Sequence, residues 1–259
     1  MAEPTPPTGS HPRRLVGVGL GPGDPGLVTV KGVATLAAAD VILVPQTEAA
    51  GDAAGRAERI VTVACPGASA AIRRVPFSMA DPAGVTSRRR QAWADSAAAA
   101  LDAFETGAHT VVFATVGDPS VYSTFSYLAG HVTQACPDVT VEVVPGISAM
   151  QALAATSRVP LVEGTEVLAL VPVTAGLDVL ERALDVADTV VAYKAGRRWP
   201  QVRELLDRRG RTATSLVGTD VSLPSEHVRS VADLDGEATS PYFSTVLVAP
   251  ARTSIGGRL

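Results

Sequence analysis

Aromatic side chains, histidine and cysteine are all scarce in this chain of 259 residues, which has 4% aromatics, four histidines and two cysteines. Cys65 and Cys136 fit neither a metal-ligand spacing nor a redox pair, which favours reduced thiols in the cytoplasm and predicts no metal site. No apolar run approaches the roughly 18 residues that a membrane span needs. A net charge of -4 disfavours a nucleic-acid-binding surface. Composition and charge therefore favour neither a nucleic acid nor a membrane as a partner.

The first twelve residues are rich in proline, threonine and glycine and lack the apolar core of a signal peptide. They are predicted to form a disordered leader. The remaining length is enough for one large domain or two small ones.

Strands and helices alternate between residues 13 and 157, which predicts an α/β domain with a mainly parallel sheet. Strands are expected at 13–19, 40–44, 60–63, 110–114 and 139–144, and helices at 27–39, 87–104, 120–135 and 147–156. Ser87 is the expected N-cap of the second of these helices.

A linker around residues 157–161 is expected to lead into a second α/β domain, residues 161–259. Expected there are strands 167–171, 189–193, 214–217, 228–231 and 243–248, and helices 177–184 and 200–208. The last strands follow one another without helices, so part of this sheet should be antiparallel. Two α/β domains with a ligand cleft between them are the predicted fold.

Three loops at strand ends carry the clearest functional signal. They are 17–25 (GVGLGPGDP), 115–124 (TVGDPSVYST) and 143–149 (VVPGISA). Loops that follow parallel strands lie at the carboxyl edge of the sheet, where ligands bind in open α/β folds. We therefore expect these three loops to face a ligand.

The first loop does not fit a dinucleotide fingerprint. The G-x-G-x-x-G pattern would need glycine at 22 or 24, where the chain has Pro22 and Asp24. The second strand ends at Pro45 with no acidic residue for a ribose hydroxyl. Tight packing at a turn explains some of the glycines but not the length of the loop.

These loops, together with 39–42 (ADVI), resemble in sequence and order the tetrapyrrole (corrin/porphyrin) methyltransferases, which use S-adenosylmethionine. Weaker matches at 190–194 (VVAYK) and 242–245 (YFST) extend the resemblance over nearly the whole chain. The resemblance implies a cofactor in the interdomain cleft, a tetrapyrrole substrate and a homodimer.

Three details favour the subgroup that methylates C-20 of precorrin-2, or its cobalt form, in cobalamin biosynthesis. These are the end of the second strand at 44–45, the PFSM segment at 76–79, and the form of the loop at 117–124. Two features depart from the family pattern: Val116 replaces a glycine, and 46–48 (QTE) replaces an expected Lys-Ser form.

The resemblance also implies site residues. The cofactor contacts would be Pro22, Val116, Gly117, Asp118, Val121, Ser148, Ala149, Ala195 and Asp220. Asp118 would favour the cationic cofactor, although an Asp-Pro turn or a helix N-cap also explains it.

The substrate carries many carboxylates, which guanidinium groups bind well. Arg73 and Arg74, with Tyr122, are the expected substrate residues, whereas the run 88–90 (RRR) is better explained as a solvated helical turn. No catalytic base is assigned; Tyr122, Asp118 and Glu163 remain open.

Several alternatives remain at this point. A sibling methyltransferase would act at another ring position, and a non-catalytic protein would bind tetrapyrrole or cofactor without turnover. An RNA- or protein-modifying relative and an oxidoreductase are more remote. Formation of S-adenosylhomocysteine separates an enzyme from a binding protein.

Overall fold

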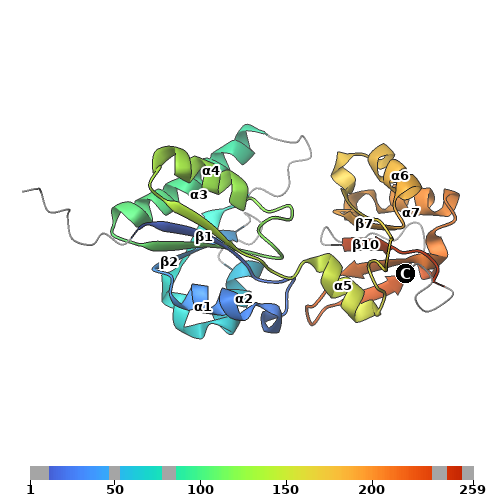
Figure 1. The fold of residues 1–259 in the computed structure, drawn as a ribbon, viewed down its shortest axis with the longest axis horizontal. Helices are drawn as coiled ribbons and strands as arrows, with labels where there is room; N and C mark the ends of the chain where they lie inside the picture. The colour runs from blue at the N-terminus through green and yellow to red at the C-terminus, as the bar shows by residue number, and fades with distance from the viewer. Residues whose placement is uncertain (1–11, 47–52, 78–85, 235–243, 253–259) are drawn as a thin grey trace, which may run out of the picture. The chain divides into compact units, whose positions relative to one another are not determined.

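The computed structural model describes residues 12–46, 53–77, 86–234 and 244–252 (Figure 1). The expected leader up to residue 11, the 47–48 and 78–79 motif segments and the 242–243 match lie outside them. Two compact units, 1–147 and 148–259, divide the chain. The sequence placed this division near residues 157–161. It falls earlier because helix α5 (Ala149–Ser157) packs with the second unit, where Leu153 belongs to a core cluster with Val191 and Leu247.

The first unit is built on a five-stranded sheet in the order β3-β2-β4-β1-β5. All its strand pairs are parallel, which confirms the expected sheet type. The strands are β1 Arg14–Gly19, β2 Val41–Gln46, β3 Ile72–Pro76, β4 Thr110–Thr115 and β5 Thr140–Val144.

Among the described residues of this unit, four α-helices cover the two faces of the sheet. Helices α3 (Ser87–Glu105) and α4 (Phe125–Ala135) lie over one face, and α1 (Val30–Ala37) and α2 (Arg56–Ala64) over the other (Figure 1). Adjacent strand residues point to opposite faces, so Leu15 packs under α3 and α4 while Val16 packs with α1 and α2. Both faces are thereby buried, as a parallel sheet requires.

The expected strand at 60–63 is wrong, because these residues lie in helix α2. Ala57, Ile60 and Val61 are buried and follow the i, i+3, i+4 spacing of one helical face, whereas Val63 is 65% exposed. A short apolar run does not distinguish a strand from a helix. The edge strand β3 was not expected, and the N-cap of α3 is Thr86 rather than Ser87, since the Thr86 side chain accepts from the Arg89 amide at 3.3 Å.

The second unit has a mixed sheet in the order β6-β7-β10-β8-β9. Only the β6–β7 pair is parallel within it, which confirms the expected antiparallel part. Its strands are β6 Leu168–Pro172, β7 Thr189–Tyr193, β8 Ser215–Thr219, β9 His227–Ser230 and β10 Ser244–Val248.

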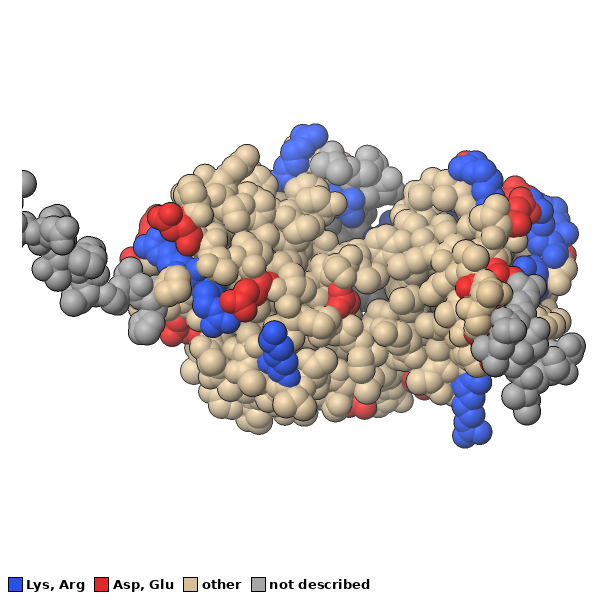
Figure 2. Space-filling view, viewed as in Figure 1, with Lys and Arg blue, Asp and Glu red and all other residues tan. Residues whose placement is uncertain are grey.

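Helices cover both faces of this second sheet as well. Helices α6 (Leu177–Val186) and α7 (Trp199–Arg208) pack into one core, in which Trp199 is 1% exposed. Helix α5 packs on the other face. Over α6 and α7, basic and acidic side chains lie side by side (Figure 2), and Arg209 bonds to Glu181 at 3.0 Å just beyond α7. Among the described residues, no helix is long and apolar enough to cross a membrane.

Candidate functional site

The loops after β1 and β4 are joined by backbone hydrogen bonds at the carboxyl edge of the first sheet. Gly21 and Gly117 form an antiparallel bridge, in which the Gly117 amide donates to Gly21 at 2.7 Å and the Gly21 amide donates to Gly117 at 3.3 Å. The Leu20 amide donates to Thr115 at 2.9 Å. The first two loops predicted from sequence therefore meet at one place.

The third loop joins them through direct backbone contact at three glycines. A Cβ on Gly19 would stand 2.6 Å from the Cα of Gly146 and 2.7 Å from the oxygen of Gly117. A Cβ on Gly146 would collide with that same oxygen. Side chains at 19 and 146 are therefore excluded by the neighbouring backbone, which explains why glycine stands at both positions.

The side of Gly117 away from this junction is open. This residue has φ +75°, and a Cβ built on it would meet no heavy atom within 4 Å. A ligand atom can thus approach the backbone here without displacing the protein. Val116 and Val121, in the same loop, are half-buried, while Pro22 from the first loop is buried.

Asp118 links the second loop to the third. Its Oδ1 accepts hydrogen bonds from the amide and hydroxyl of Ser120, and its Oδ2 accepts from the Gly146 amide at 2.8 Å. Asp118 is 8% exposed. Because β1 lies between β4 and β5, this carboxylate spans the end of β1.

The carboxyl group of Asp118 is ionised at neutral pH. Burial raises its pKa, but the bonds from the Ser120 hydroxyl and from the Gly146 and Ser120 amides together outweigh burial and lower the pKa. The Asp-Pro turn considered from sequence is present, since the Ser120 amide bonds back to Asp118 at 2.7 Å. Tyr122 follows with φ +51° and is 43% exposed.

In the second unit, Ser148 and Ala149 stand at the start of helix α5. The Ser148 amide donates to Gln151 Oε1 at 2.8 Å, and the Met150 amide donates to the Tyr193 hydroxyl at 2.9 Å. Burial raises the pKa of the Tyr193 phenol, and its bonds with Ser148 and Met150 oppose this. Tyr193 thus holds the start of α5, where two predicted site residues lie, although only a weak motif match at 190–194 pointed to it in the sequence.

The other predicted residues of this unit lie in loops after strands. Ala195 is fully buried and follows Lys194, which has φ +61°. Asp220 has φ +48° and accepts a hydrogen bond from Ser225 at 3.3 Å. Non-glycine residues at such φ values are uncommon and concentrate at functional loops.

Arg73 and Arg74 are not brought to one site. They are adjacent on β3 and so point to opposite faces of the sheet. Arg73 pairs with Asp102 of α3 at 3.1 Å, and Arg74 binds both oxygens of Glu58 of α2 at 2.8 and 2.9 Å. Sequence reasoning took these guanidinium groups for substrate ligands, whereas the structure gives each a carboxylate partner in its own unit.

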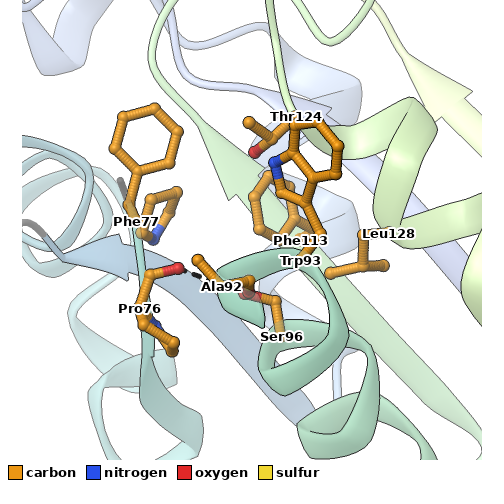
Figure 3. A pocket seen from close by; sticks show the side chains of 9 residues that line it. Pro76, Phe77, Ala92, Trp93, Ser96, Phe113, Thr124 and Leu128 are labelled. Carbon is orange, nitrogen blue, oxygen red and sulfur yellow. Dashed lines mark hydrogen bonds between the residues drawn. The ribbon is translucent and has the colours of Figure 1, made fainter. Parts of the chain in front are cut away.

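A shallow pocket lies beside the second loop (Figure 3). It is lined by Pro45, Pro76, Phe77, Ala92, Trp93, Ser96, Phe113, Thr124 and Leu128. Pro45 and Pro76 come from the carboxyl ends of β2 and β3. Trp93 stacks on Tyr127 with ring centroids 4.1 Å apart, which adds an aromatic surface next to Thr124. Sequence reasoning singled out Pro45, residues 76–77 and Thr124 as parts of motifs, but not the lining residues that α3 contributes.

These features describe a site for binding and orientation. The described residues contain no group of three His, Cys, Asp or Glu that could hold a metal ion. The loops offer backbone groups, a buried carboxylate and apolar side chains. Such a set suits a reaction in which two bound molecules are oriented for direct group transfer.

A family model described as Tetrapyrrole (Corrin/Porphyrin) Methylases matches residues 14–235. Two curated relatives match over nearly their full lengths. Cobalt-precorrin-2 C(20)-methyltransferase of Salmonella typhimurium is 30% identical over 91% of this chain and 95% of its own. Precorrin-2 C(20)-methyltransferase of Sinorhizobium sp. is 33% identical over 91% of this chain and 94% of its own.

The fold is shared with solved structures of lower identity. Uroporphyrin-III C-methyl transferase from Thermus thermophilus, complexed with S-adenosylhomocysteine, superposes with a TM-score of 0.65 at 22% identity. The match covers 91% of this chain and 97% of that one. A cobalt precorrin-4 methyltransferase gives the same TM-score and identity, over 91% of this chain and 94% of its own.

Proposed function

The chain belongs to the tetrapyrrole (corrin/porphyrin) methylases, and we propose that it transfers a methyl group from S-adenosylmethionine to C-20 of precorrin-2 or of its cobalt form, in cobalamin biosynthesis. The observation that carries this proposal is the similarity, across more than nine-tenths of the chain, to relatives named for C(20) methylation of these substrates. The subgroup details at 44–45, 76–79 and 117–124 favour the same ring position.

The described loops fit a bound S-adenosylmethionine. A Cβ built on Gly117 would meet no heavy atom within 4 Å, so a ligand has space to lie against the backbone there. The residues proposed to hold the cofactor are Pro22, Val116, Gly117, Asp118, Val121, Ser148, Ala149, Ala195 and Asp220. When bound, the cofactor supplies a methyl group on a positively charged sulfur.

The protein contributes orientation and exclusion of water. Gly117 lets a ligand lie against the backbone, and Val116 and Val121 in the same loop are apolar and half-buried. Holding donor and acceptor in line lowers the barrier by up to roughly 7–11 kcal/mol in ideal cases. The ionised Asp118 accepts hydrogen bonds from Ser120 and Gly146, which join the loops after β4 and β5.

For the macrocycle, the stacked pair of Trp93 and Tyr127 offers a flat apolar surface beside the same loop. Tyr122 lies close to it in sequence and is exposed enough to contact a substrate. Arg73 and Arg74 are the other proposed substrate residues. Each would first have to leave its ion pair with a carboxylate of the protein.

The activity test uses the purified chain with precorrin-2 and with cobalt-precorrin-2, and with S-adenosylmethionine labelled in the methyl carbon. We expect one label per macrocycle, located at C-20 by carbon NMR. A label at another position would support the sibling activity. Binding of both ligands without S-adenosylhomocysteine would support the non-catalytic alternative. Comparison of the two substrates decides between the cobalt and the metal-free form.

Two further proposals come from the family resemblance alone. The chain is proposed to form a homodimer, which sedimentation at micromolar concentration tests. It is also proposed to act in the cytoplasm, which fractionation of cells of its source tests.

A further inference from the structure

We infer that Asp118 acts as a positioning residue, which holds the loop after β5 against the loop after β4, and does not itself contact the positive sulfur of the donor. This inference rests on the proposed function and assigns a specific part to one residue of the cofactor site. It replaces the direct contact expected from sequence with an indirect role.

Hydrogen bonds within the protein occupy both carboxylate oxygens. Oδ1 accepts from the amide and hydroxyl of Ser120, and Oδ2 accepts from the Gly146 amide. The residue is 8% exposed, so little of it remains for a ligand. Bonds to an ionised acceptor are about twice as strong as neutral ones, so exchanging them for a sulfonium contact is unfavourable.

These bonds hold in place the three-glycine junction, the contact of Gly19, Gly117 and Gly146 at which the three loops meet. Asp118 follows Gly117 directly, and its Oδ2 fixes the amide of Gly146, whose Cα lies against Gly19. The carboxylate thus sets how the loops after β4 and β5 meet across the end of β1. Gly117 belongs to this junction, so a change in how the loops meet also changes the backbone that borders its open side.

The test compares two ligands that differ in charge at sulfur. S-adenosylmethionine carries a positive sulfur, whereas S-adenosylhomocysteine is neutral there. For Asp118→Asn, calorimetry should show both affinities falling together by about ten- to hundredfold, as expected for loss of charge-assisted bonds. Their ratio should stay within about twofold of wild type, because positioning affects both ligands alike.

Asp40→Asn is the matched control. Asp40 also accepts hydrogen bonds from two backbone amides, those of His109 and Thr110, both at 2.8 Å. These bonds lie at the amino ends of β2 and β4, at the opposite edge of the sheet. The control should lower stability and leave both ligand affinities unchanged, which separates local positioning from general loosening of the unit.

A second readout needs no ligand. Hydrogen exchange at the Gly146 amide should become faster in Asp118→Asn and stay unchanged in Asp40→Asn. If Asp118→Asn does not fold, Ser120→Ala removes only the hydroxyl bond to Oδ1 and should lower both affinities by a smaller, equal factor.

Three results would overturn the inference. One is a loss of S-adenosylmethionine affinity at least tenfold greater than the loss for S-adenosylhomocysteine. Another is wild-type affinity for both ligands in Asp118→Asn, and the third is unchanged exchange at Gly146. If the wild-type chain binds neither ligand, the proposed function fails instead, and the Gly146 exchange alone decides whether Asp118 holds the loops together.

Discussion

The hydroxyl of Tyr193, at the end of β7, accepts a hydrogen bond from the amide of Met150 in the first turn of α5, at 2.9 Å. The first amides of a helix have no partner within the helix. This contact therefore satisfies a donor and fixes the helix start, where Ser148 and Ala149 are proposed to meet the cofactor.

Tyr193→Phe should lower the free energy of unfolding by about 1–3 kcal/mol, because the Met150 amide loses its partner in a half-buried position. Urea unfolding followed by circular dichroism measures this change. The control Tyr127→Phe alters a ring that is 48% exposed and should change stability by less than about 0.5 kcal/mol. An equal loss in both variants would contradict a specific role for the Tyr193 hydroxyl.

Gly19→Ala should lower the free energy of unfolding by about 3 kcal/mol, at the upper end of overpacking costs, because the new methyl meets backbone of both Gly146 and Gly117. Gly130→Ala is the matched control. It lies inside α4, where a Cβ meets nothing within 4 Å, and it should raise stability by about 0.5–1 kcal/mol. Thermal unfolding of both variants provides the comparison, and a tolerated alanine at 19 would show that the junction is looser than the structure indicates.

The pH dependence of stability should depend in part on Asp40. Bonds from the amides of Thr110 and His109 lower its pKa below the ordinary value of 3.8. A lowered pKa in the folded state contributes stability that is present above the unfolded value and is lost as the pH falls through the folded value. The exposed position limits this contribution to about 1 kcal/mol.

The measurement is the difference in unfolding free energy between wild type and Asp40→Asn at several pH values. We expect a constant difference from pH 7 to about pH 5, and a decrease toward zero below about pH 4. A difference that grows as the pH falls would have the opposite sign and would show that Asp40 is not held in its ionised form.

Arg74→Ala tests whether this guanidinium serves the fold or the substrate. Its bidentate pair with Glu58 is partly buried, with side-chain exposures of 37% and 16%. Breaking the pair should cost about 0.5–1 kcal/mol of stability and leave KM for the tetrapyrrole unchanged. Arg73→Ala, which breaks a more exposed pair, should cost less. A rise in KM of tenfold or more at unchanged stability would instead support the substrate role expected from sequence.

The sequence predicted the elements whose patterns are unambiguous. The strand 189–193 and the alternation along both units follow from strongly apolar, β-branched runs between polar helices. The prediction failed at 60–63, because Ile60 and Val61 fit the apolar spacing of either a strand or a helix. Only their packing with Ala57 shows that they belong to a helix. The edge strand β3 was missed because its two adjacent arginines interrupt the apolar spacing by which a strand is recognised.

For the candidate site, sequence located the loops but not the function of each side chain. The glycines at 19 and 146 are needed because two backbones touch, a long-range contact that no local pattern encodes. Asp118 looked like a ligand for a cation, yet its partner Gly146 lies in another loop. Tyr193 could be recognised only once β7 and α5 were placed together.

The two tryptophans of the chain fall one in each unit, Trp93 on α3 and Trp199 on α7. Trp199 is almost fully enclosed, whereas Trp93 lies against a phenol ring near solvent. Their fluorescence should therefore differ in emission wavelength, with the enclosed indole emitting further to the blue. Replacing either one by phenylalanine leaves a single tryptophan, so each half of the chain can be followed by tryptophan emission without an attached dye.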